Sequence, residues 1–365
     1  MKSNEKILLL ITKAEVGGAQ NFVANLAKGL KESGREVSIA AGEGEYLSEY
    51  AHDQQINFFR IKDLKRGFSF LANLSFLRNS LKYIKENKFD VIHLNSTNTL
   101  LLAPFLKIFS KKTKIVFTVH GLSVLDPGYE DNILKKLLFF IFFKFNLLFV
   151  NEIVFVSENN LKIAQKNKIT NRGIVIYNGA EVDFYNREVA REYLIEKSKI
   201  LEDSFLIGSV GRLAYPKNYE FLINNFKEVL GEIPNAKLIL IGDGPNREKY
   251  QKLIGERGLD NDVLLLGEIV DAAKYLKGLD LFVLPSIYEG LSISLIETVL
   301  AKVPAIASDV GGNYEVIGKE SCFRLNNKES FLEILKLVSN KSSIQDPKKF
   351  SLNTMVTKYL EIYKK

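Results

Sequence analysis

Two glutamates, Glu289 and Glu297, flank the expected start of a helix that follows the apolar run Leu281–Leu284. A carboxylate there can accept hydrogen bonds from sugar hydroxyls, and the free backbone amides and the dipole at a helix start favour phosphate. Ser292 is suited to cap that helix, and the free amides are those of Gly290, Leu291 and Ser292. The sequence therefore predicts a pocket for a phosphate-bearing sugar, with a solvated pair of glutamates as the alternative.

Two cations follow another apolar run, Phe205–Val210, because Gly211 precedes Arg212 and Lys217 lies five residues beyond Arg212. Arginine offers a planar fork of donors and lysine a compact point charge, a combination that suits a diphosphate. Since surface cations are common, this pair is a weak signal by itself.

A histidine and a glycine pair also stand just after predicted strands. His120 follows Ile115–Val119 and can either reach a ligand or make an ordinary buried contact. Gly17 and Gly18 follow Ile7–Ile11, where glycine lets backbone amides approach an anion at a helix start. A glycine-rich connection without a ligand is the alternative for that pair. We predict a structural role for the chain's other strand histidine, His93.

Several patterns argue against other kinds of site. Gly242 and Gly244 resemble the start of a dinucleotide fingerprint, but Arg247 stands at the third glycine position, so we predict a tight turn. Asp260 and Asp262 have a metal-binding spacing, yet they precede a predicted strand and would lie at the wrong sheet edge, again in a turn. One cysteine and three histidines exclude a disulfide framework and a cysteine-based zinc cluster, so we predict no metal.

The elements that must position these residues are short apolar runs alternating with segments of helical period. Unbroken apolar runs are typical of parallel strands covered by helices on both faces, and the alternation predicts an α/β protein of two doubly wound domains. We expect a linker in the charged stretch Glu181–Asp203 and a final amphipathic helix at Leu352–Tyr363. The predicted strands are Ile7–Ile11, Val37–Ala40, Val91–Leu94, Ile115–Val119, Ile153–Val156, Ile174–Tyr177, Phe205–Val210, Leu238–Ile241, Val263–Leu266, Leu281–Leu284 and Ala305–Ala307.

Composition bounds the function classes. The 365 residues are 46% hydrophobic and 25% charged, which excludes a largely disordered chain. The net charge of +7 divides into +9 for residues 1–180 and −2 for residues 181–365. A basic half can face nucleic acid, an anionic membrane or an anionic ligand, or it can be ordinary solvated surface. We find no nucleic-acid-binding motif beyond this charge and expect no nucleic-acid partner.

The most apolar stretch is Leu137–Val150, which contains Lys144 and is too short to span a bilayer. It predicts either a buried core helix or a helix lying at a membrane surface. The polar N-terminus and the short run after it predict no signal peptide.

Together these motifs resemble glycosyltransferase family 4 over nearly the whole chain. The most specific part runs from Glu289 to Glu315 and contains Glu297, Pro304 and Asp309-Val310-Gly311-Gly312. The supporting matches are Gly17-Gly18-Ala19, Thr118-Val119-His120-Gly121, Asn178-Gly179, Gly211-Arg212-Leu213 with Lys217, Gly242-Asp243-Gly244-Pro245 and Leu266-Gly267.

The resemblance implies the GT-B fold, in which two Rossmann-like doubly wound domains face a central cleft and a C-terminal helix crosses back to the first domain. Residues 1–180, with 350–365 crossing back, would form the acceptor-side domain. Residues 181–349 would bind the nucleotide-sugar donor.

The resemblance also implies roles for single residues. Glu289 would contact the donor sugar and Glu297 the ribose. Arg212 and Lys217 would bind the diphosphate, and His120 would approach the sugar. Catalysis would rest on Glu289, Arg212, Lys217 and His120, and donor binding on Gly17, Gly18, Gly211, Gly290, Leu291, Ser292 and Glu297.

Three positions depart from the family pattern. Asn218 stands where the family commonly has glycine, Thr298-Val299-Leu300 replaces a common Ala-Met-Ala, and Val303 occupies a frequent glycine position. The charged positions that would contact the donor are intact, which favours an active enzyme.

The expected function is that of a retaining hexosyl- or N-acetylhexosaminyltransferase. It would use a nucleotide diphosphate sugar, UDP-linked by family bias, without a metal or other cofactor. The acceptor would be lipid-linked or a cell-surface polysaccharide, and the protein cytoplasmic, with peripheral contact to anionic lipid at the inner face of the membrane. The alternatives are a sugar-nucleotide epimerase on the same fold and a non-catalytic glycan- or membrane-binding protein.

Overall fold

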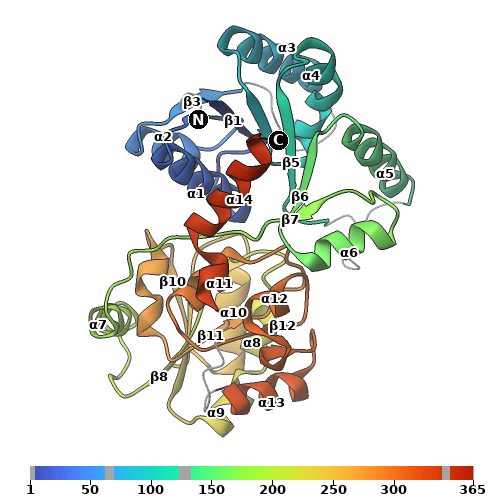
Figure 1. Ribbon diagram of the computed structural model, residues 1–365. Coiled ribbons are helices and arrows are strands. Elements are labelled where there is room, and N and C mark those ends of the chain that lie inside the picture. Colours follow the sequence, from blue (N-terminus) through green and yellow to red (C-terminus); the bar gives the residue numbers. More distant parts are fainter. Residues whose placement is uncertain (1–4, 62–69, 123–132, 339–345, 365) are drawn as a thin grey trace. The chain divides into compact units, whose positions relative to one another are not determined.

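The computed structural model describes residues 5–61, 70–122, 133–338 and 346–364. The chain divides into two compact units. Unit 1 comprises Met1–Ala180 and Phe350–Lys365, and unit 2 comprises Glu181–Lys349. The final helix α14 (Leu352–Lys364), at the red end of the colour scale in Figure 1, therefore belongs to the same unit as the blue start of the chain.

Unit 1 is built on a seven-stranded parallel sheet in the order β3-β2-β1-β4-β5-β6-β7. The strand order reverses between β1 and β4, and open sheets of this kind bind ligands beyond the strand ends at such a switch point. The strands are β1 (Lys6–Ile11), β2 (Glu36–Ala41), β3 (Asn57–Arg60), β4 (Val91–Leu94), β5 (Lys114–Val119), β6 (Glu152–Phe155) and β7 (Ile174–Val175).

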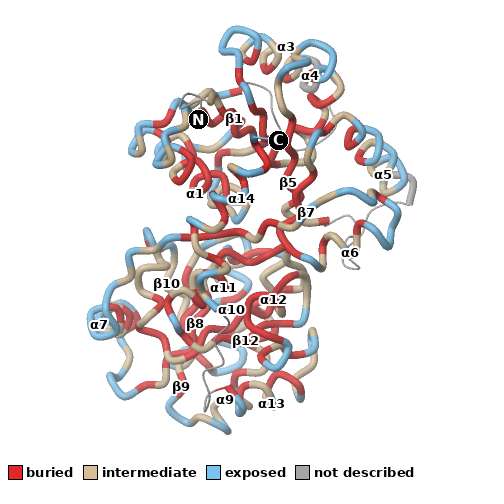
Figure 2. The backbone as a smooth tube through the Cα atoms, viewed as in Figure 1, coloured by how far each residue is buried: buried red, intermediate tan, exposed pale blue. Residues whose placement is uncertain are grey.

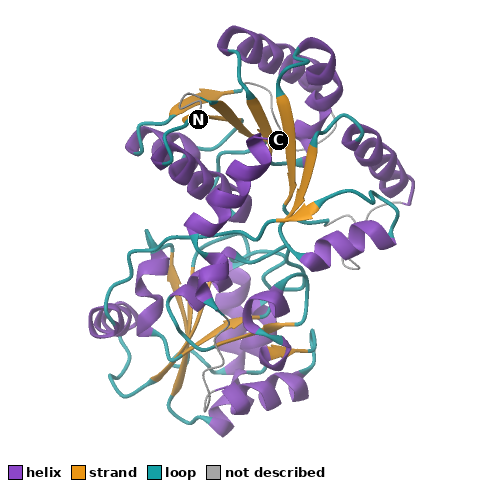
Figure 3. Cartoon of the chain, in the orientation of Figure 1, coloured by secondary structure: helices purple, strands orange, loops and turns teal. Residues whose placement is uncertain are grey.

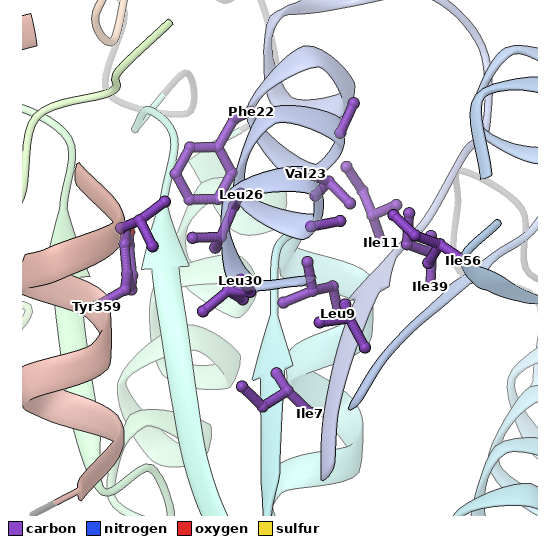
Figure 4. Packing of buried hydrophobic residues seen from close by; sticks show 14 of the residues in the cluster. Ile7, Leu9, Ile11, Phe22, Val23, Leu26, Leu30, Ile39, Ile56 and Tyr359 are labelled. Carbon is purple, nitrogen blue, oxygen red and sulfur yellow. The ribbon is translucent and has the colours of Figure 1, made fainter. Parts of the chain in front are cut away.

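Helices cover both faces of this sheet, which is why its central strands are mostly apolar. Side chains of β1 alternate between two cores, since Ile7 and Leu9 pack with α1 while Leu8 and Leu10 pack on the opposite face (Figure 4). The first face is covered by α1 (Gly18–Glu32), α2 (Tyr46–Asp53) and α14. The second is covered by α3 (Phe70–Asn87), α4 (Ala103–Phe109), α5 (Ile133–Leu147) and α6 (Glu158–Lys166).

The helix α14 lies directly against α1. A Cβ added at Gly29 of α1 would overlap the side chain of Val356 on α14, so glycine permits the close approach of the two helices. Tyr359 of α14 is fully buried beside Phe22 of α1, with ring centroids 5.7 Å apart (Figure 4).

Unit 2 repeats the architecture on a six-stranded parallel sheet, in the order β10-β9-β8-β11-β12-β13. Figure 3 shows the strands of both units in orange among purple helices. Here the order reverses between β8 and β11. The strands are β8 (Phe205–Val210), β9 (Ala236–Ile241), β10 (Val263–Gly267), β11 (Leu281–Leu284), β12 (Ala305–Ser308) and β13 (Cys322–Phe323). The helices are α7 (Arg187–Ser198), α8 (Tyr219–Asn224), α9 (Phe226–Glu232), α10 (Arg247–Arg257), α11 (Ile293–Leu300), α12 (Asn313–Ile317) and α13 (Lys328–Val338).

These two parallel sheets confirm the predicted α/β class and its two doubly wound domains. The turns predicted at Gly242–Pro245 and Asp260–Asp262 are also confirmed. The prediction of a linker over Glu181–Asp203 was wrong, because most of this stretch is helix α7 of unit 2. Arg191 of α7 pairs with Asp280 at 2.9 Å, which holds the helix on the unit.

The apolar stretch Leu137–Val150 is only partly buried, as the mixed colours of α5 in Figure 2 show. Phe143 and Leu147 are buried in the core of unit 1, whereas Leu138 and Ile141 are more than half exposed. The predicted core helix is thus confirmed for one side of the stretch, and contact with a membrane stays a prediction. Among the described residues, no helix has the length and apolar character needed to cross a membrane.

Candidate functional site

A charged hydrogen bond at the strand ends of unit 2 joins Lys217 to Glu289. Lys217 lies between β8 and α8, and Glu289 lies between β11 and α11, so the two side chains come from the strands that flank the switch point. Lys217 Nζ donates to Glu289 Oε1 at 2.7 Å, and the side chains are only 19% and 13% exposed. Burial lowers the pKa of Lys217, but the Glu289 carboxylate outweighs it, and the net pKa is raised. Lys217 is therefore held as a cation.

Ser286 also supports the carboxylate. Its buried hydroxyl donates to Glu289 Oε1 at 2.7 Å, the same oxygen that receives Lys217. The backbone carbonyl of Ser286 in turn accepts a hydrogen bond from the hydroxyl of Ser308, at the end of β12. Sequence reasoning missed Ser286, although its place two residues after β11 was a usable signal.

Glycines let the neighbouring loops approach this pair. A Cβ at Gly311 would overlap the carbonyl oxygen of Glu289, and φ of Gly311 is +55°, a left-handed conformation that favours glycine. A Cβ at Gly211 would lie 3.1 Å from Cε of Lys217 and 2.8 Å from the hydroxyl of Tyr219. The motif glycines therefore act partly by making room for the Lys217–Glu289 pair.

Arg212 differs from Lys217 in its surroundings. Its side chain is exposed, and its guanidinium makes no hydrogen bond or ion pair with any residue that the structure describes. All its donors are thus available to a ligand at the end of β8.

Asn218 explains one of the departures from the family pattern. Its φ is +57°, a left-handed conformation where glycine is common and asparagine is tolerated. Its side chain donates to the carbonyl of Pro285 at 3.1 Å, which ties the loop after β8 to the loop after β11. The substitution thus retains the backbone conformation that a glycine would supply.

The start of α11 forms the remaining part of the unit 2 site. Ser292 caps the helix as predicted, accepting from the amide of Leu295, and Gly290, Leu291 and Ser292 are buried. Glu297 lies in the second turn, and burial raises the pKa of its carboxyl to about 8. A carboxyl with this pKa is mostly protonated at neutral pH and can both donate and accept hydrogen bonds, which suits contact with a ligand hydroxyl.

In unit 1, Gly17 and Gly18 lie at the start of α1, directly beyond β1. Gly17 precedes the helix and Gly18 is its first residue. A Cβ at Gly18 would meet nothing within 4 Å, whereas one at Gly17 would lie 2.6 Å from Oε1 of Gln20. Both glycines thus stand at a helix start, the kind of position that favours an anion.

His120 follows β5 and has a buried ring nitrogen. Its Nε2 has no hydrogen-bond partner among the described residues, and its ring packs edge-on against Phe22 with centroids 4.7 Å apart. Burial lowers the pKa of His120 to about 3. The imidazole is therefore neutral at physiological pH and can donate or accept one hydrogen bond.

Behind His120 lies a buried polar network that sequence reasoning only partly found. His93 contacts the hydroxyl of Tyr363 and that of Thr118, each at 2.7 Å, and Thr118 also contacts the hydroxyl of Tyr359 at 2.9 Å. The structural role predicted for His93 is confirmed. The two α14 tyrosines were missed, since only the fold brings them to β4 and β5.

Unit 2 thus gathers Gly211, Lys217, Glu289, Gly290, Leu291 and Ser292 around the ends of β8 and β11, with Arg212 on the same loop as Lys217 and Glu297 on α11. Unit 1 places Gly17, Gly18 and His120 beyond β1 and β5. Two Rossmann-like units with their polar residues at the strand ends define a glycosyltransferase of the GT-B fold.

Comparison with known proteins agrees with this class. The family model for "Glycosyltransferase Family 4" matches residues 16–184, and that for "Glycosyl transferases group 1" matches residues 190–354. The O-antigen biosynthesis glycosyltransferase WbnH of Escherichia coli is 30% identical over 84% of this chain and 82% of its own length. The chain belongs to glycosyltransferase family 4.

Two further similarities bear on function and fold. The UDP-Gal:alpha-D-GlcNAc-diphosphoundecaprenol alpha-1,3-galactosyltransferase of Escherichia coli is 26% identical over 84% of this chain and 80% of its own length. The crystal structure of Anabaena HepE in complex with UDP and glucose superimposes with a TM-score of 0.82, at 18% identity and 99% coverage of both chains. The second similarity shows the shared fold.

Proposed function

We propose that this glycosyltransferase moves a sugar, with retention of anomeric configuration, from a UDP-sugar to a lipid-linked glycan that becomes part of a cell-surface polysaccharide. The observation that carries the donor half is the Lys217–Glu289 pair at the unit 2 switch point, with the exposed cation Arg212 beside it. The acceptor half is supported by two relatives, one named for action on a diphosphoundecaprenol-linked sugar and one for O-antigen biosynthesis.

The residues divide the chemistry between them. Lys217 and Arg212 neutralise the charge that grows on the leaving diphosphate, and the amides at the start of α11 add fixed dipoles. Because these groups supply positive charge, the proposed reaction needs no metal ion or other cofactor. Glu289 accepts hydrogen bonds from the donor sugar while its other contacts, Lys217 and Ser286, hold the carboxylate in place. His120 contributes a neutral hydrogen-bonding group from unit 1.

The donor is identified by a thermal-shift screen of UDP-, GDP-, ADP- and dTDP-sugars. A ligand at 100 times its dissociation constant stabilises the native state by about 2.7 kcal/mol, which a melting curve detects readily. We expect a UDP-sugar, of hexose or N-acetylhexosamine type, to give the largest shift.

Transfer is then tested with that donor and a sugar-diphospho-lipid acceptor, with product configuration read by NMR. We expect UDP release that requires the acceptor, and an α-linked product from an α-linked donor. Conversion of the donor to an epimer without any acceptor would show that the protein is an epimerase and not a transferase. Donor binding without turnover on a panel of acceptors would indicate a binding protein.

A lipid-linked acceptor also places the enzyme at a membrane. We therefore propose a cytoplasmic protein with peripheral contact to the inner face of the cell membrane, attracted by the basic charge of residues 1–180.

A further inference from the structure

Exposed apolar side chains concentrate on two neighbouring helices of unit 1, α4 and α5, which contact each other. Of the sixteen large apolar side chains that are exposed in the described part of the chain, eight lie on or beside these helices, and they are 36% to 71% exposed. Scattered exposed apolar residues are ordinary, whereas a contiguous patch marks an interaction surface. We name this set the α4–α5 surface: Phe105, Ile108, Phe109, Leu137, Leu138, Ile141, Phe145 and Leu148.

The spacing makes this surface one face of each helix. On α5, the exposed residues Leu137, Ile141, Phe145 and Leu148 recur every three or four positions, while Phe143 is buried in the core. Helix α5 is thus fixed to the sheet by one side and turns a second apolar side to solvent (Figure 2).

Lysines accompany the apolar residues. Lys107 on α4, Lys111 and Lys112 just after it, and Lys144 on α5 are all exposed. Neither α4 nor α5 contains an aspartate or a glutamate. An apolar face with lysines and no acidic residues is complementary to an anionic bilayer, where the rings enter the acyl boundary and the ammonium groups remain among the headgroups.

A second copy of the chain fits this surface poorly. In a two-fold symmetric contact the same patch meets itself, which would place the lysines of one copy against those of the other. Protein interfaces are also depleted of lysine at their centres. The charge therefore selects lipid over a homodimer.

We infer that the α4–α5 surface docks the enzyme on anionic lipid bilayers. The α4–α5 surface would be the part of the protein that makes the membrane contact proposed above. Only the reason for that contact, a lipid-linked acceptor, rests on the proposed function. Unit 1 would thereby be held where a lipid-linked acceptor is anchored.

The experiment uses the full chain, which contains no tryptophan. Single variants Phe109→Trp and Ile141→Trp place a fluorophore on each helix of the surface. Leu201→Trp, at a position 73% exposed in unit 2, is the matched control. With vesicles of phosphatidylcholine and phosphatidylglycerol, we expect a blue shift of emission and quenching by brominated lipid in the first two variants and neither in the control.

The charge contribution is tested in the Phe109→Trp background. Lys111→Glu with Lys112→Glu should weaken vesicle binding by at least about 25-fold, at about fivefold per lysine lost. The control pair Lys227→Glu with Lys252→Glu makes the same change of net charge on exposed residues of unit 2 and should leave binding within about twofold. Raising the salt from about 0.1 M to about 1 M shortens the Debye length from about 10 Å to about 3 Å and should release the protein.

Three outcomes would overturn the inference. They are an absence of any shift at the two surface positions, equal binding to pure phosphatidylcholine at high salt, and a shift without vesicles that grows with protein concentration. The last would show pairing of two copies. Acceptor-dependent UDP release in detergent is measured on the same variants, so loss of transfer with intact vesicle binding would contradict the proposed function alone.

Discussion

The partly buried Lys217–Glu289 pair and the exposed Arg212 make a matched comparison. We assign both cations to the same diphosphate, but only Lys217 is expected to support the folded protein. We consider Lys217→Met, which keeps the aliphatic stem over Gly211, and Arg212→Met. Each should lower the turnover rate by about 10²–10³, as expected when one preorganised donor to a developing negative charge is removed.

Their effects on stability should differ. Lys217→Met leaves the Glu289 carboxylate, whose side chain is 13% exposed, without a counter-charge and, among the described residues, with only the hydrogen bond from the hydroxyl of Ser286. Loss of a charged hydrogen bond at this degree of burial costs about 2–3 kcal/mol, since a fully buried broken pair costs about 3–5 kcal/mol and an exposed one under about 1 kcal/mol. For a unit of this size, that lowers the unfolding midpoint by roughly 4–12 °C. Arg212→Met should leave the midpoint unchanged.

Calorimetry, which separates the transitions of two units if they unfold independently, gives the midpoints, and acceptor-dependent UDP release gives the rates. Adding Glu289→Gln to Lys217→Met should restore about 1.5–3 kcal/mol of stability without restoring turnover. Wild-type turnover in both single variants would refute the leaving-group roles. An unfolding midpoint unchanged by Lys217→Met would refute the energetic account of the pair.

Three further predictions concern pH and packing. Burial raises the pKa of Glu297 to about 8, so the folded state binds a proton more tightly than the unfolded chain. The melting temperature should therefore fall as pH rises from about 4.5 to about 8, and Glu297→Gln should flatten this decline. An unchanged slope in the variant would contradict the prediction. Burial lowers the pKa of His120 to about 3, so its imidazole should stay neutral between about pH 5 and 8. His120→Ala should therefore reduce turnover but leave the shape of the rate–pH profile in this range unchanged. Loss of a limb of the profile near pH 6.5 would show instead that His120 titrates there. Gly29→Val should lower the free energy of unfolding by about 1–3 kcal/mol, because the added side chain forces α14 away from α1. Adding Val356→Ala to Gly29→Val should recover part of this loss. Equal melting temperatures of the single and the double variant would show that the two helices do not make this contact.

Most of the sheet framework could be predicted from the sequence because parallel strands covered on both faces are mostly apolar along their length. The runs at Val91–Leu94, Phe205–Val210 and Leu281–Leu284 coincide with β4, β8 and β11. The edge strand β3 was missed, since its four residues include polar Asn57 and Arg60 and none of the four is buried. Helix α7 was taken for a linker because a charged helix with one narrow buried side has the composition of a loop.

At the candidate site, local patterns in the sequence predicted which residues would lie at the strand ends, but not which of them would contact each other. The order of strands places Lys217 and Glu289 near the same sheet edge, and this much follows from topology. Their ion pair spans 72 residues and depends on Ser286 and on glycines that admit neighbouring loops, which no local pattern encodes. The pKa of Glu297 likewise depends on what buries it.

The return of α14 to unit 1 imposes an order on folding. Unit 2 lies wholly between β7 and α14 in the chain, so it can fold on the ribosome while unit 1 still lacks a helix from one face of its sheet. The hydrogen bond between His93 and Tyr363 joins residues 270 positions apart, so until it forms, His93 of β4 and the side of α1 that packs on α14 lack their partners. Completion of unit 1 is thereby delayed until unit 2 has been made, so a nascent chain cannot complete the polar network around His93 before unit 2 exists.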